Sequence, residues 1–377
     1  MTDPAQPRGD DFPALRAIAE RFELGGPISG IEPLGQGNVN DTYLVRLGDT
    51  ARPAAVLQRV NTQVFTRPEL VMGNLVTFSD HVARRMREPP RELAGRRWEV
   101  PRVFPAREDG RPWVWEGSNF WRALGYVQGA QSLERIGHSG HAREIGFALG
   151  MFHRLISDLP VEHLADTLEG FHITPSYLRH FDQVLGQLSS HGDAELDDCL
   201  AFVEQRRSLV PVLEQAKASG ELRQRPIHGD PKINNVMLDL QADRAVALVD
   251  LDTVKPGLVH YDIGDCLRSA CNPLGEEADD WRAVHFDVGL CDLLLKGYGS
   301  VASSFLTDAD YRHIPAAIRL ISFELGLRFL TDHLAGDVYF KTRHRGHNLR
   351  RARVQFKLTQ SIEEQDAAIQ AVVAAMR

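Results

Sequence analysis

The spacing of apolar residues changes character roughly one third of the way along the chain. Before that point, short apolar runs alternate with glycine-rich and charged turns. This pattern predicts strands on either side of a turn within 31–45, and further strands over 54–60, 100–104, 112–116 and 120–127. Two stretches, 12–25 and 66–87, instead repeat their apolar residues at helical spacing. The first third is therefore expected to be a sheet accompanied by two helices.

From Ser139 onward, helical spacing dominates. The segment up to Ile156 is apolar almost throughout, which predicts a buried helix, and further helical runs follow over 175–222 and 281–377. One buried strand is expected over 245–251. We therefore predict an α+β protein with two lobes: a small N-terminal, sheet-containing lobe over 1–125 and a large, mainly helical lobe over 126–377.

Composition narrows the class of protein. The 377 residues are 43% hydrophobic and 25% charged, as is usual for soluble globular proteins. A formal net charge of −8 argues against a nucleic acid or an anionic membrane as the main partner. The four cysteines form neither a C-x-x-C pair nor a secretory framework. Residues 1–11 do not show the basic and then apolar pattern of a signal peptide, and the sequence contains no 18-residue apolar run. We expect a cytoplasmic protein.

The chemistry concentrates in the sequence HGDPKINN, residues 228–235, and in the apolar run that ends at Asp250. An Asp followed by Lys two positions on and Asn five positions on, with a later Asp after a strand, suits phosphoryl transfer. Asp230 would accept the proton of an acceptor hydroxyl and Lys232 would reach the γ-phosphate. Asn235 and Asp250 would offer oxygen ligands to Mg²⁺. A surface turn is the alternative, because Gly, Asp, Pro and Asn all favour turns.

Two nearby residues are expected to support this stretch rather than react, and a histidine in the helical run after Ser139 is expected to lie in the core. His228 would brace the loop, and His153 would be a core histidine whose ring is hydrogen-bonded. Asp262 would hold the loop by accepting hydrogen bonds. Asp262 follows so soon after Asp250 that no long activation segment fits between them, which argues against a regulated protein kinase.

A glycine-containing turn within 31–45 is the candidate phosphate-binding loop. Gly35 and Gly37 would let backbone N–H groups approach phosphate oxygens, and we expect Asn38 and Asn40 of the same turn to lie in the nucleotide site. A plain hairpin turn is the alternative interpretation.

The strand over 54–60 lacks the lysine that kinases place there to bind phosphate. Direct matching puts Gln58 at that position. A shift of one residue would substitute Arg59, which we favour for its charge. The segment joining the lobes is expected near 126–129, where the backbones of Tyr126 and Val127 would contact adenine.

The stretch 228–235, with its H-G-D-x-x-x-x-N pattern, together with Asp250 and Asp262 resembles the aminoglycoside phosphotransferase and choline kinase superfamily. The longer strings GNVNDTYLV (37–45), VLQRVN (56–61), LVDLDTVKPG (248–257), YDIGD (261–265) and FELGLRFLTDHLAGDVYFK (323–341) resemble one branch of it more closely, the N-acetylhexosamine 1-kinases. The resemblance covers most of the chain. It implies a protein-kinase-like fold, the use of ATP and Mg²⁺, and Asp230 as the catalytic base.

The same resemblance concerns the acceptor. It implies that Arg328 and Tyr339 help to bind a sugar, while Ser269 stands where an aromatic residue is expected in the sugar pocket and Asn38 where a histidine is expected. The implied reaction is phosphorylation of the anomeric hydroxyl of an N-acetylhexosamine. Two alternatives stay open: a kinase of another sugar, an amino alcohol or an aminoglycoside, and a nucleotide-binding protein without catalytic activity.

Overall fold

The structure is a computed structural model that describes residues 12–35, 39–48, 52–187 and 194–377. The chain forms two compact units. The first contains residues 1–88 and 99–129, and the second contains 89–98 and 130–377. The short segment 89–98 thus interrupts the first unit in sequence but folds with the second, where Arg96 pairs with Glu144.

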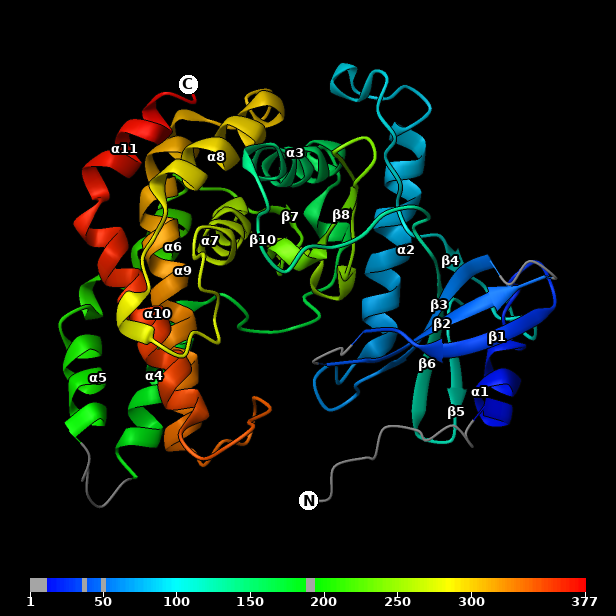
Figure 1. Ribbon diagram of the computed structural model, residues 1–377, viewed down its shortest axis with the longest axis horizontal. Coiled ribbons are helices and arrows are strands. Elements are labelled where there is room, and N and C mark those ends of the chain that lie inside the picture. Colours follow the sequence, from blue (N-terminus) through cyan, green and yellow to red (C-terminus); the bar gives the residue numbers. More distant parts are fainter. Residues whose placement is uncertain (1–11, 36–38, 49–51, 188–193) are drawn as a thin grey trace. The chain divides into compact units, whose positions relative to one another are not determined.

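The first unit is built on an antiparallel sheet (Figure 1). Its strand order is β1-β2-β3-β6-β4, and β5 also pairs with β6. The strands are β1 (Ile28–Pro33), β2 (Asp41–Leu47), β3 (Arg52–Val60), β4 (Val103–Phe104), β5 (Val114–Glu116) and β6 (Asn119–Gly125). The predicted strands are therefore present, although β4 keeps only the last two residues of the run predicted over 100–104.

Two helices accompany this sheet, α1 (Phe12–Ala19) and α2 (Pro68–Arg85). The prediction of one helix over 12–25 was too long, because the chain leaves α1 and Phe22 forms a β-bridge with Ala106. Phe22 is nonetheless completely buried in the core of this unit, so its apolar character reflects tertiary packing rather than a continuing helix.

The second unit is mainly helical. Its helices are α3 (Ser139–Ile156), α4 (Thr174–Leu185), α5 (Ala194–Glu204), α6 (Val212–Ala218), α7 (Val259–Ala270), α8 (Val288–Ala302), α9 (Asp308–Leu334), α10 (His347–Glu364) and α11 (Asp366–Ala374). Two antiparallel pairs of short strands join them: β7 (Arg225–Ile227) with β10 (Lys255–Gly257), and β8 (Val236–Asp239) with β9 (Arg244–Leu248). Single 3₁₀ turns occupy Arg91–Leu93, Val161–His163, Arg207–Leu209, Ile233–Asn235, Leu251–Thr253 and Trp281–Ala283.

Helices α3 and α8 pack side by side at close range (Figure 1). Glycines make this possible: a Cβ atom on Gly146 would lie 1.9 Å from the Leu294 carbonyl oxygen, and one on Gly297 would lie 2.0 Å from the Arg143 carbonyl oxygen. Any side chain at either position would force the helices apart. This contact holds α3, and with it His153, in place.

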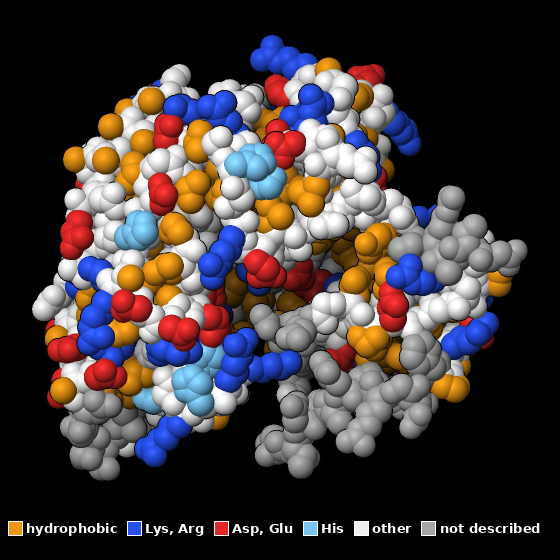
Figure 2. Space-filling model, viewed as in Figure 1, with side chains coloured by type: hydrophobic (Ala, Val, Ile, Leu, Met, Phe, Trp, Pro, Cys, Tyr) orange, Lys and Arg blue, Asp and Glu red, His pale blue; other side chains and the backbone are white. Residues whose placement is uncertain are grey.

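The predicted α+β class is confirmed, with the antiparallel sheet in the N-terminal part and a mainly helical C-terminal part. None of the four cysteines forms a disulfide bond, and all four are buried. Figure 2 shows acidic and basic side chains interspersed on the face in view. None of the helices in the described part of the chain combines the length and apolar character needed to span a bilayer.

Candidate active site

The loop that follows β7 brings three of the predicted residues together. The Lys232 ammonium lies 2.8 Å from Asp230 Oδ2. The Asn235 amide nitrogen donates to the Asp230 carbonyl at 2.7 Å, which leaves the amide oxygen as the atom that can face a cation. Asp230, Lys232 and Asn235 thus form one compact cluster, because the loop turns back through the 3₁₀ turn at Ile233–Asn235.

Asp250 lies close enough to act on this cluster electrostatically. It follows β9 and adopts a left-handed backbone conformation with φ 64°. Burial opposes the charge on Lys232, but the carboxylates of Asp230 and Asp250 outweigh it and raise the pKa of the lysine above its usual value. Lys232 therefore keeps its positive charge at neutral pH. Carboxylate and amide oxygens are the donors that suit Mg²⁺, so Asp250 and Asn235 fit that ion chemically.

One carboxylate holds this loop. Asp262, fully buried on α7, accepts hydrogen bonds from the backbone N–H of His228 at 2.7 Å and of Gly229 at 2.8 Å. It also accepts one from His153 Nε2 at 2.8 Å, while His153 Nδ1 meets the Tyr298 hydroxyl. Asp262 thus holds the loop as expected, and His153 is the hydrogen-bonded core histidine that was expected, although its contact with Asp262 was not predicted. A buried carboxylate that is satisfied in this way fixes the backbone before Asp230.

His228 also braces the loop, as predicted. Its Nε2 donates to the Val249 carbonyl at 3.0 Å, and its Nδ1 accepts from the Asp230 N–H at 3.2 Å. Burial lowers the pKa of His228, so the ring is neutral. Gly229 has φ +88°, and a Cβ atom there would lie 2.7 Å from the Thr253 carbonyl oxygen. Only glycine fits this turn.

A second buried support was missed from the sequence. His172 contacts the Gly229 carbonyl through Nε2 at 2.8 Å and Glu324 through Nδ1 at 2.9 Å. Both of its nitrogens face acceptors, so the ring donates twice. Burial opposes this charged form, yet Glu324 and Asp265 more than offset burial and raise the pKa of His172. Thr174 donates to the second Glu324 oxygen at 2.6 Å.

Arg328 lies on α9, one turn beyond Glu324. Its guanidinium carbon lies 5.2, 5.0 and 5.5 Å from the ring centres of Phe171, Tyr177 and Phe340. The rings hold the guanidinium plane through cation–π contacts, and no hydrogen bond from it is found within the described residues. Burial raises the pKa of Tyr177 to about 12, so its hydroxyl stays protonated beside the arginine.

Tyr339 belongs to a segment, residues 338–340, that we call the acceptor loop. The Asp332 carboxylate accepts the backbone N–H groups of all three loop residues, at 3.0, 2.8 and 2.9 Å. Asn348 donates to the same carboxylate at 2.9 Å. Tyr339 itself stays 58% exposed, so the loop is fixed by its backbone while its side chain remains accessible.

Ser269 lies beside the loop formed by residues 228–235, which we call the catalytic loop. Its hydroxyl donates to the Cys266 carbonyl at 3.0 Å and faces the Ile233 N–H at 3.4 Å. Close in sequence, the buried Arg268 donates to Asp265 Oδ1, and the Asp265 Oδ2 atom has no hydrogen-bond partner within the described residues. The region next to Ser269 is therefore polar, and serine supplies no ring for stacking.

In the first unit, Gln58 and Arg59 have different partners. Gln58 accepts two hydrogen bonds from Arg122, whose side chain is almost fully buried and also contacts Met72 of α2. Arg59 pairs with Asp41 on the neighbouring strand. The buried Arg122 was missed, because its sequence context predicted only a strand. Gln58 of β3 thus lies on the side of the sheet where the guanidinium of Arg122, on β6, extends toward α2.

The other predicted nucleotide residues lie near the strand ends. Gly35 has φ +69°, a conformation that favours glycine. Asn40 is buried and accepts the Asn61 N–H at 3.0 Å. The Tyr126 N–H bonds to the Ala54 carbonyl at 3.2 Å, and Val127 is buried. Gly37 and Asn38 lie outside the described residues.

Comparison with known protein families gives a match that covers most of the chain. The model of a family described as the phosphotransferase enzyme family matches residues 30–289. That range includes Gly35, Gln58 and Arg59 of the first unit and the whole catalytic loop.

Solved structures share the fold over nearly the whole chain. A microcompartment-associated aminopropanol kinase matches 95% of this chain and 98% of its own, with TM-score 0.62 and 17% identity. An aminoglycoside phosphotransferase from Alicyclobacillus acidocaldarius matches 100% and 98%, with TM-score 0.59 and 16% identity. A macrolide 2′-phosphotransferase from Brachybacterium faecium matches 92% and 97%, with TM-score 0.54 and 14% identity. At these identities the likeness establishes the fold alone.

Proposed function

The chain belongs to the phosphotransferase enzyme family, and from that premise we propose that it is an ATP- and Mg²⁺-dependent kinase of N-acetylhexosamines that forms the sugar 1-phosphate. The observation that carries the proposal is the clustering of Asp230, Lys232 and Asn235 on one braced loop. Phosphoryl transfer depends mainly on positioning and charge, and this loop supplies both.

The chain's own residues have distinct roles in this reaction. Asp230 accepts the proton of the acceptor hydroxyl, and the charged Lys232 stabilises the transferred phosphoryl group. Asn235 and Asp250 would hold Mg²⁺, which neutralises phosphate charge when bound. Gly35, Gly37, Asn38 and Asn40 are proposed to contact the nucleotide.

The proposed nucleotide contacts also include three positions at or beside the sheet. The backbones of Tyr126 and Val127 would contact adenine. We favour Gln58 over Arg59 as the residue that stands in place of the phosphate-binding lysine. Gln58 holds the buried guanidinium of Arg122, whereas Arg59 is already paired with Asp41.

The acceptor is inferred from the second unit. Arg328 is oriented by three aromatic rings and has N–H groups available for hydrogen bonding, which suits a neutral sugar hydroxyl or an acetamide oxygen. A cation at this position disfavours a polycationic aminoglycoside. The anomeric hydroxyl is the most acidic sugar hydroxyl, so a carboxylate base such as Asp230 suffices.

A kinase of another sugar or of an amino alcohol is the second candidate. It is favoured by Ser269, which offers a hydroxyl next to the catalytic loop where a stacking ring would strengthen sugar binding. An acceptor without a flat apolar face would lose nothing by this replacement.

An acceptor screen tests the proposal. ATP consumption would be measured with N-acetylhexosamines, free hexoses, choline, homoserine, aminopropanol and aminoglycosides, and the product position would be assigned by phosphorus NMR. We expect an N-acetylhexosamine to be preferred and phosphate to appear on the anomeric oxygen. Phosphate on another oxygen, or preference for a non-sugar, would overturn the acceptor assignment. ATP binding without turnover on any acceptor would overturn the catalytic one.

A further inference from the structure

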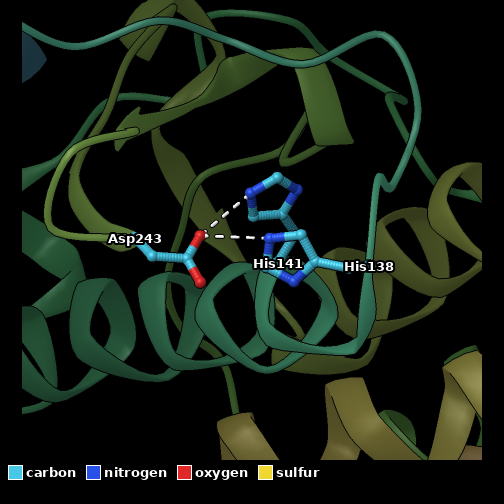
Figure 3. Close-up of side chains that lie close together, drawn as sticks. All are labelled: His138, His141 and Asp243. Carbon is cyan, nitrogen blue, oxygen red and sulfur yellow. Dashed lines mark ion pairs between the residues drawn. The ribbon is translucent and has the colours of Figure 1, made fainter.

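Two histidines and an aspartate meet on the second unit, away from the catalytic residues in sequence. His138 is the N-cap residue of α3, His141 lies in the first turn of that helix, and Asp243 lies in the turn between β8 and β9. Both imidazoles are directed at one carboxylate oxygen of Asp243 (Figure 3). We propose that these three residues form a binding site for a divalent transition-metal ion, with Zn²⁺ as the best match.

The distances fit such an ion. His138 Nε2 lies 3.3 Å and His141 Nε2 lies 3.0 Å from Asp243 Oδ1, and the three ligand atoms all fall within 4.8 Å of one another. Tetrahedral Zn²⁺ with bonds of about 2.0–2.1 Å separates neighbouring ligand atoms by about 3.3 Å. The ligand atoms therefore need only small movements to surround an ion.

The donor set indicates the class of metal. Two imidazoles and one carboxylate suit Zn²⁺ and its neighbours in the first transition row, whereas Mg²⁺ prefers an all-oxygen environment. The His138 and Asp243 side chains are about half exposed, at 52% and 46%. Solvent therefore has access to the cluster, and a water molecule would complete the coordination.

The cluster is already organised by its surroundings. The Glu144 carboxylate accepts the Ala245 N–H at 2.8 Å, which ties α3 to the start of β9 next to Asp243. Asp243 has φ 53°, and a Cβ atom on Gly140 would lie 2.8 Å from the His138 ring and 3.0 Å from the Asp243 carboxylate. Glycine at 140 thus makes room for the three groups to converge.

Metal binding through Nε2 requires that the proton of each imidazole, in His138 and His141, lie on Nδ1, and this requirement has a cost in free energy. His138 Nδ1 accepts the Gly140 N–H at 3.1 Å, so coordination through Nε2 would move the ring proton to Nδ1 and release this cap to water. Loss of one helix cap corresponds to about fivefold in an equilibrium constant. His141 Nδ1 is buried and has no partner within the described residues, so its change of tautomer breaks no bond. Three metal–ligand bonds outweigh the loss of one cap.

The test uses untagged full-length protein, because a polyhistidine tag would bind the same metals. After treatment with a chelator, the protein would be titrated with Zn²⁺ against a chromophoric zinc indicator. We expect one equivalent to bind with micromolar affinity or tighter, unaffected by excess Mg²⁺. Co²⁺ alone should give the visible absorption bands of a four-coordinate ion.

Variants connect the binding to these residues. His138→Ala and Asp243→Asn both alter half-exposed side chains, and Asn tolerates the left-handed conformation at 243, so both should fold. Each should weaken Zn²⁺ binding at least tenfold, while the exposed His163→Ala control should match wild type. The apo melting temperature should stay near wild type for Asp243→Asn and fall slightly for His138→Ala, which removes one helix cap. Zn²⁺ should raise the melting temperature of wild type more than that of either variant. Substoichiometric binding, or equal affinity in wild type and both variants, would overturn the proposal, and neither outcome bears on the proposed kinase activity.

Discussion

The catalytic loop and the acceptor loop are held by the same device, a buried carboxylate that collects backbone N–H groups. Asp262 is completely buried and fixes the backbone of His228 and Gly229, immediately before Asp230. Asp332 is 5% exposed and fixes the backbone of the acceptor loop, residues 338–340. In both places oriented backbone N–H groups and one side-chain donor satisfy the buried carboxylate.

The two loops differ in what surrounds their side chains. Around the catalytic loop, side chains are constrained as well: Lys232 pairs with Asp230, and no side chain fits at Gly229. In the acceptor loop, Val338 and Tyr339 are 78% and 58% exposed. Fixing the backbone alone lets the exposed residues change without disturbing the fold. If the two loops have the proposed roles, the chemistry is built on a rigid loop, whereas the residues that choose the acceptor can vary.

The largest effect is expected at the reacting residue. Asp230→Asn removes the base but keeps the size of the side chain, so kcat should fall by about 10²–10⁴ while ATP affinity changes little. Asp250→Ala should instead weaken binding of Mg·ATP, because its carboxylate would serve the metal. Steady-state kinetics and nucleotide titration separate the two. Similar loss of nucleotide binding in both variants would contradict the assignment.

The next largest effects are expected at the two supporting carboxylates, Asp262 and Asp332, whose substitution should change stability by different amounts. Asp262→Asn leaves fewer acceptors for three fully buried donors, so it should destabilise the protein by roughly 2–4 kcal/mol and reduce kcat. Asp332→Asn should cost about 1–2 kcal/mol, since water can reach that loop, and should mainly raise the KM for the acceptor.

Urea unfolding and steady-state kinetics measure both effects. Asp279→Asn is the matched control, because that side chain is 97% exposed and should change stability by less than about 0.5 kcal/mol. If Asp332→Asn lowered kcat as much as Asp262→Asn, the distinction between the two loops would be lost.

The sequence predicts contacts between residues that are close along the chain, and it does not predict contacts between residues that are far apart along it. Asp230, Lys232 and Asn235 lie within one turn of chain, so their spacing alone brings them together. The partners of His172 are Gly229 and Glu324, far away along the chain, and no local pattern reports such a contact. The same holds for Arg122, whose burial depends on the strand and helix packed around it. The end of the first helix was predicted wrongly for a related reason. Phe22 lies outside the helix because it forms a β-bridge with Ala106, which is far away along the chain.

A smaller effect is expected from substituting Arg328. It tests whether the residues proposed to contact the acceptor change the KM rather than kcat. Arg328→Met keeps the apolar stem against the three rings but removes the donors. The KM for the acceptor should rise about 10- to 100-fold, as expected for the loss of a charged hydrogen bond. Arg223→Met, at an exposed position, is the control. An unchanged KM would exclude Arg328 from acceptor binding.

A pH-dependent effect is expected at the link between the two regions. His172 joins the catalytic loop at Gly229 to α9 at Glu324, the helix that also carries Arg328 and Asp332. The pKa of His172 is raised in the folded protein, so the stability that its charge provides is fully present below the unfolded value of 6.5 and is lost as pH rises through the folded value. His172→Gln should therefore lower the free energy of unfolding by roughly 2 kcal/mol at pH 6 and by less at pH 9. The left-handed backbone at this position, φ 62°, adds a cost to glutamine that is the same at every pH and cancels in the comparison. Urea unfolding of both proteins across this range measures the difference, and a deficit that did not shrink with rising pH would show that the ring contributes through packing rather than through its charge.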